Sequence, residues 1–62
     1  MKFITLASRG GNYQVVASNV AWLREAENGQ TLVGMVGSAA ILVSGTVAET
    51  AAIILAEVNG LA

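Results

Sequence analysis

Hydrophobic and polar positions alternate along this chain in short runs, and turn-forming residues separate the runs. Alternation with a period of two is typical of β-strands, whose successive side chains point to opposite faces. It predicts strands over residues 2–7, 13–18, 20–27, 30–36 and 39–43. Because the intervening loops are short, neighbouring strands are expected to pair antiparallel, as hairpins.

The strongest local signal is the pair Asn28-Gly29, which lies between two apolar-rich runs. Both central residues of a type I′ turn have positive φ, and Asn and Gly adopt that conformation most readily. We therefore expect a β-hairpin with its turn at these two residues.

The two strands of this hairpin differ in pattern. Strict alternation in the third strand places Val20, Trp22 and Arg24 on one face and Ala21, Leu23 and Glu25 on the other. The fourth strand is apolar on both faces, with Leu32 and Val36 on one and Val33 and Met35 on the other. A strand that is apolar on both sides is expected to be covered on both sides.

A helix is predicted after the last strand. The segment Thr46-Val47-Ala48-Glu49 matches the capping box, in which the Thr hydroxyl and the Glu carboxylate satisfy free backbone N–H groups. The helix should run to about Val58, where Asn59-Gly60 supplies a left-handed end. At 100° per residue its apolar stripe consists of Val47, Ala51, Ile54, Leu55 and Val58. Ile53 falls outside this stripe.

These elements predict an α+β fold in a single small domain covering residues 1–62. A small, hairpin-rich antiparallel sheet of about five short strands precedes one C-terminal amphipathic helix. The helix should bury its stripe on one face of the sheet, and the other face should stay partly apolar.

Composition indicates that this domain does not work alone. Of its 62 residues 55% are hydrophobic and 11% charged, against a usual charged share of about 25%. A small core is normally reinforced by disulfides, a metal or oligomerisation, and the chain contains neither Cys nor His. We therefore expect a homo-oligomer or a protein partner. The candidate interface residues are Trp22, Leu32, Val33, Met35, Val36 and Ile53.

The aromatic residues Trp22 and Tyr13 have two interpretations. Large aromatic side chains often anchor a protein partner. The chain has few other large side chains to fill a core, which favours packing of both residues inside the domain.

Chemistry-bearing residues are few. Without His, Cys or Asp the common catalytic triads cannot form, so we expect no enzyme, no cofactor, no metal and no small-molecule substrate. Glu25 and Glu27 superficially resemble a carboxylate pair, but two glutamates beside a turn usually mark a solvated strand end. The loop Ser8–Gly11 could offer N–H groups to an anion, but no helix follows it and it matches no phosphate-loop pattern, which favours an ordinary hairpin loop.

Charge and hydropathy limit the partners further. Three basic and four acidic residues give a net charge of −1, which argues against nucleic-acid binding. The start of the chain is interrupted by Arg9 too early for a signal peptide, so no export is expected. Residues 28–48 carry no charge and are long enough to span a bilayer, but their Gly, Ser and Thr content favours short strands over a membrane helix.

Hydrophobic spacing also gives a resemblance. Ile4-Thr5-Leu6, the Val15-Val16 strand, Trp22-Leu23 before an acidic stretch, and Val43-Ser44 before a Glu-containing helix start resemble the small flagellar and swarming-motility proteins of the FlbD type. The chain departs from them at the Asn28-Gly29 turn and in its Ala-rich helix. The resemblance implies a short-stranded sheet followed by a helix, and no functional residue is carried over.

Three functions follow as expectations. The first is a non-enzymatic structural or assembly protein, either a small homo-oligomer or a minor subunit that coats or cements a larger particle such as a phage virion. The alternatives are a flagellar accessory protein that binds a membrane-associated protein, and a very small membrane protein. For the first function we expect a cytoplasmic or virion-associated location.

Overall fold

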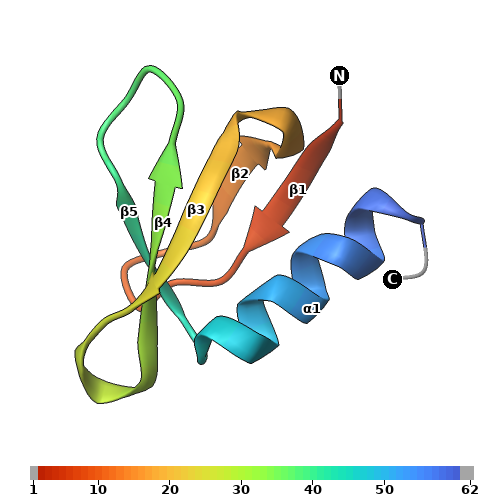
Figure 1. Cartoon of the computed structure of the whole chain (residues 1–62). Helices are drawn as coiled ribbons and strands as arrows, with labels where there is room; N and C mark the ends of the chain where they lie inside the picture. The colour runs from red at the N-terminus through yellow and green to blue at the C-terminus, as the bar shows by residue number, and fades with distance from the viewer. Residues whose placement is uncertain (1, 61–62) are drawn as a thin grey trace.

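The computed structural model describes residues 2–60 and confirms the α+β fold (Figure 1). Its elements are β1 (Phe3–Leu6), β2 (Tyr13–Val16), the 3-10 turn η1 (Ala17–Asn19), β3 (Val20–Glu25), the 3-10 turn η2 (Glu27–Gly29), β4 (Gln30–Met35), β5 (Ile41–Ser44) and α1 (Val47–Val58). The strands are shorter than predicted, and at some of their expected ends the residues belong to turns, as at 17–18, 27 and 36.

The five strands form two antiparallel sheets and not one. β1 pairs with β2, and β3, β4 and β5 form the second sheet in that order. Residues 17–19, expected to end the second strand and start a turn, form η1, which redirects the chain between the sheets. The sheets meet where the Ser44 N–H donates to the Ala7 carbonyl at 2.8 Å.

The core lies between the two sheets and α1. Its fully buried hydrophobic residues are Ile4 and Leu6 of β1, Val33 of β4 and Val43 of β5. α1 packs against β1, β3 and β4 (Figure 1). The helix also covers the outer edge of β1, where the Thr5 N–H donates to the Glu57 carboxylate at 3.1 Å. Covering an edge in this way removes it as a pairing site for another strand.

A β-bulge in β3 overturns the alternation predicted for this strand. Val20 is opposite Met35, but Trp22 is opposite Gly34, so that Ala21 is an extra residue. Such an insertion shifts the side chains on one side of it to the other face. Val20 therefore lies on the same side as Leu23, and both pack against the core.

The predicted type I′ turn is confirmed, and the connection includes one residue more than predicted, Glu27. Asn28 and Gly29 have φ values of 59° and 71°, both in the left-handed region. The Gln30 N–H donates to the Glu27 carbonyl, whereas the Gln30 carbonyl accepts from the Ala26 N–H. Two residues thus face Gln30, and Glu27 belongs to the turn and not to β3. The predicted extension of the strand through Glu27 is wrong for this reason.

The predicted helix ends are confirmed. The Thr46 hydroxyl accepts from the Glu49 N–H at 3.1 Å, and the Thr46 N–H donates to the Glu49 carboxylate at 2.9 Å. At the other end Gly60 has φ of 72° and its N–H donates to the Glu57 carbonyl. The helix is therefore fixed at both ends by local hydrogen bonds.

The buried face of α1 is rotated away from the predicted stripe. Thr50 is 2% exposed, whereas Leu55, a member of the stripe, is 62% exposed. Glu57 must face β1 to accept from Thr5, and Thr50 and Ile54 lie on the same side of the helix as Glu57. The helix orientation that brings the Glu57 carboxylate to the Thr5 N–H thus leaves Leu55 outside the core.

We expect the capping box to make folding pH-dependent. The Thr46 N–H and hydroxyl hold the pKa of Glu49 below its ordinary value of 4.5. Its contribution to stability is therefore complete above that value and is lost as pH falls through the lowered pKa. Urea unfolding of Glu49→Gln across this range should show a shallower fall in stability than the parent protein. An equally steep fall in both proteins would contradict this assignment.

Two buried threonines should respond oppositely to the same substitution. The Thr31 hydroxyl donates to the Gly45 carbonyl at 2.8 Å, while the Thr50 hydroxyl finds no partner among residues 2–60. Removing a satisfied hydroxyl leaves its partner unpaired, whereas removing an unsatisfied one relieves a desolvation cost. Thr31→Val should lower the free energy of unfolding, and Thr50→Val should raise it, each by about 1 kcal/mol. Urea denaturation measures both; a decrease in Thr50→Val would contradict the expectation.

Candidate interaction surface

One face of the three-stranded sheet points away from the core and from α1. The strand register places its members side by side: Trp22 is opposite Gly34, Arg24 is opposite Leu32, and Leu32 is opposite Leu42. We call these five residues the outer sheet face. Trp22 is 49% and Leu42 41% exposed, and Leu32 is half-buried.

Trp22 and Gly34 form the centre of the outer sheet face. A Cβ at position 34 would overlap the indole ring, so the ring lies directly on the backbone of β4. Glycine in a strand interior often marks the close approach of another group. The aromatic ring supplies the side-chain contact that Gly34 lacks, and Gly34 is buried although Trp22 remains half exposed.

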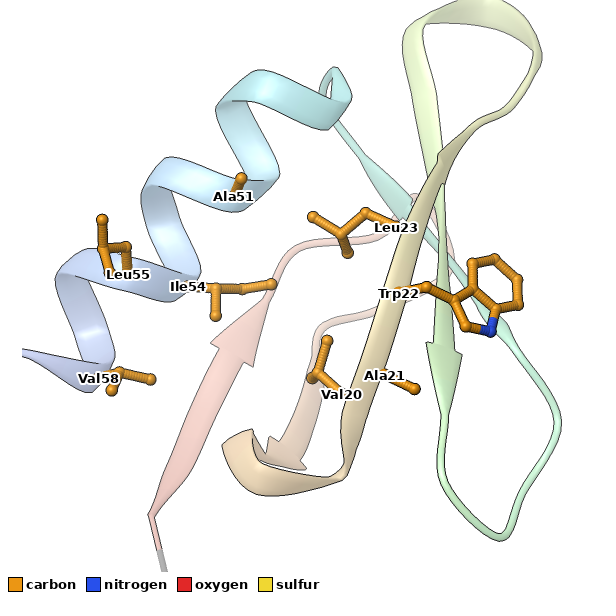
Figure 2. A pocket seen from close by; sticks show the side chains of 8 residues that line it. All are labelled: Val20, Ala21, Trp22, Leu23, Ala51, Ile54, Leu55 and Val58. Atoms are coloured by element: carbon orange, nitrogen blue, oxygen red, sulfur yellow. The ribbon is translucent and has the colours of Figure 1, made fainter.

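A groove lies on the other side of β3, between this strand and α1. It has a volume of about 430 Å³ and is lined by Val20, Ala21, Trp22, Leu23, Ala51, Ile54, Leu55 and Val58. Val20 and Leu23 point toward α1, whereas the Trp22 indole points to the opposite side of β3 (Figure 2). The groove is therefore apolar, with no acid, base or nucleophile to perform chemistry in it.

Three of the charged side chains make hydrogen bonds away from the groove. Glu49 caps α1, Glu57 accepts from Thr5, and Arg9 donates to the Asn28 carbonyl at 3.2 Å. Within residues 2–60 no group of three or more His, Cys, Asp or Glu side chains is placed to hold a metal ion. The loop considered as an anion site is instead braced against the turn of the β3–β4 hairpin.

The predicted interface residues lie in different places. Val33 is fully buried, and Met35 is half-buried and packs against the core. Val33 therefore cannot contact a partner while the fold is intact, because its face of β4 is covered by the domain itself. Trp22, Val36 and Ile53 are exposed by 49%, 61% and 46%, and Leu32 is half-buried.

The aromatic residues do not fill the core, contrary to the favoured interpretation. Trp22 is half exposed, and Tyr13 is 40% exposed on β2. Small aliphatic residues close the core without them. Sequence reasoning also missed several exposed hydrophobic side chains: Phe3, Leu42, Leu55 and Val58. The position of Leu42 could have been inferred from Gly34. Because Gly34 lies opposite Trp22, it identifies the outer face of β4, and Leu42 lies opposite Leu32 on that same face.

Residues 28–48 form the β3–β4 turn, β4, β5 and the connection into α1. In the described part of the chain no helix is long and apolar enough to cross a membrane. The uncharged stretch is therefore explained by two short strands, which its glycine and β-branched content predicted.

Comparison with protein-family models, with curated proteins and with solved structures finds no match to this chain. The resemblance to the FlbD-type proteins therefore stays a prediction.

The contact between Trp22 and Gly34 predicts a fluorescence change. Gly34→Ala should push the indole off β4 into water, because a methyl group cannot share its position. Trp22 is the only tryptophan, so its emission maximum should move to longer wavelength. Gly10→Ala, in an open loop position without a positive φ, is the control for a general effect of added methyl groups. An unchanged emission maximum in Gly34→Ala would contradict the contact.

Proposed function

We propose that this chain is a non-enzymatic structural protein that assembles through its apolar surface. It acts as a small homo-oligomer or as a minor subunit that coats or cements a larger particle such as a phage virion, in the cytoplasm or on the virion. The observation that carries the proposal is the distribution of its large hydrophobic side chains. Among residues 2–60, eight of them are exposed by 40% or more: Phe3, Tyr13, Trp22, Val36, Leu42, Ile53, Leu55 and Val58.

The arrangement of these residues supports contacts on more than one side. The outer sheet face and the groove lie on opposite sides of β3. A standard interface buries about 800 Å² on each partner, roughly a fifth of the 3959 Å² that the chain exposes. One such contact cannot cover all of the exposed apolar residues, so a second contact is expected, as in a lattice or a ring.

The remaining surface supports a binding role over a catalytic one. Three of its seven charged residues cap the helix, cover a strand edge or brace a loop, and the chain has no His, Cys or Asp. The flagellar accessory role rests on the resemblance alone, and no feature of the surface favours it.

Sedimentation velocity tests the proposal. The parent chain should sediment above its monomer mass of 6.3 kDa at micromolar concentration, or copurify from its source with a protein at fixed stoichiometry. Leu42→Lys should weaken that association at least about tenfold, because it places a charge on the apolar outer sheet face. Ser38→Lys, which adds the same charge to an exposed turn, is the matched control and should have little effect.

A chain that stays monomeric at high concentration and copurifies with no protein would overturn the proposal. If Leu42→Lys and Ser38→Lys associated equally well, the outer sheet face would not be part of the proposed contact.

A further inference from the structure

The outer edge of β3 is open for pairing. β3 is the terminal strand of its sheet, and its hydrogen bonds to β4 alternate along the strand. Ala26 donates to its opposite residue Gln30, so Arg24 is also a hydrogen-bonded position, whereas Leu23 and Glu25 are not. The N–H and C=O groups of Leu23 and Glu25 therefore point away from β4.

The outer edges of β1 and β5 are each closed at one outward N–H group. The outward N–H of Thr5 in β1 donates to Glu57, and the outward N–H of Ser44 in β5 donates to the Ala7 carbonyl. For the N–H groups of Leu23 and Glu25 the described residues supply no acceptor. Proteins usually protect such an edge with Pro, charged side chains, a bulge or a covering segment. β3 contains neither Pro nor Lys, and its protection is limited to the bulge at Ala21 and the opposite charges of Arg24 and Glu25.

The apolar groove continues from this open edge. Val20, Ala21 and Leu23 form its wall on β3, and Ala51 and Leu55 belong to the facing wall on α1 (Figure 2). A strand added beside β3 would place alternate side chains toward α1. Its inward residues must be apolar and its backbone must supply hydrogen bonds, which is the requirement for strand addition at a sheet edge.

We propose that the occupant is β3 of a second copy, paired antiparallel about a two-fold axis at Leu23. The two three-stranded sheets then form one continuous six-stranded sheet. This inference rests on the proposed function, because it names the partner and the contact through which assembly begins.

The charges on β3 select this register. Three antiparallel self-pairings use the outward groups of Leu23 and Glu25. An axis at Arg24 places Arg24 opposite its copy, and an axis at Glu25 places Glu25 opposite its copy, and like charges in these positions are destabilising. With the axis at Leu23, Arg24 lies opposite Trp22 of the second copy and Glu25 lies opposite Ala21.

This register also uses the outer sheet face. The Arg24 guanidinium of each copy meets the half-exposed indole of the other, which is a favourable cation–π arrangement. On the inner side the two Leu23 side chains meet beside the grooves and cover part of the exposed Leu55. A single two-fold contact therefore satisfies the open edge and covers apolar surface on both sides of β3.

Glu25→Pro tests the inference against Glu25→Ala. Proline is tolerated on an edge strand where the N–H faces solvent, so the monomer fold should persist, but the outward donor is lost. Because the axis repeats the loss in both copies, the dissociation constant should rise about tenfold or more in Glu25→Pro. Glu25→Ala keeps the N–H and should dimerise as the parent chain does. Sedimentation gives the constants, and circular dichroism reports whether each variant is folded.

Amide exchange in the parent chain gives a second measurement that needs no variant. The Leu23 and Glu25 amides should gain protection as protein concentration rises, while the Arg24 amide, bonded to β4, is protected at every concentration. An oligomer in which Leu23 and Glu25 still exchange freely would overturn the edge pairing and leave the proposed function standing. A monomer without any partner would overturn both.

Discussion

One helix of twelve residues has to cover the inner sides of two sheets, and the rest of the structure follows from how it does so. The hydrogen bond between the Thr5 N–H and the Glu57 carboxylate fixes the rotation of α1 over β1. That rotation buries Thr50 and turns Leu55 outward. The core is consequently small, with four fully buried hydrophobic side chains in the described part of the chain, and much apolar surface remains exposed.

Local patterns in the sequence predicted the elements well. The Asn28-Gly29 turn, the capping box at Thr46 and the left-handed end at Gly60 each depend on a few neighbouring residues, and the structure confirms all three. The division of the strands into two sheets depends on contacts between distant segments. Those contacts are set by packing, which alternation along a single strand does not encode.

The candidate surface was harder to predict, because single residues reversed its faces. The extra residue at Ala21 moved Val20 to the side of Leu23, so strict alternation assigned the faces of β3 incorrectly. Trp22 is exposed, as an interface residue must be, but its contact with the backbone at Gly34 was not predicted. β4 is apolar on both faces, as predicted, but the domain itself covers the face that carries Val33. A bulge and a backbone contact of this kind leave only faint signals in one sequence.

The bond between Thr5 and Glu57 joins residues 52 positions apart, and this separation has a consequence for the order of folding. All five strands precede α1 in the chain, so during synthesis both sheets leave the ribosome before the segment that closes them. Contacts of high sequence separation form late and slow the folding of small β-rich domains. Until the helix docks, the edge of β1 and the inner faces of both sheets are open to neighbouring nascent chains. The capping box, which needs only residues 46–49, lets the helix begin locally and shortens that interval.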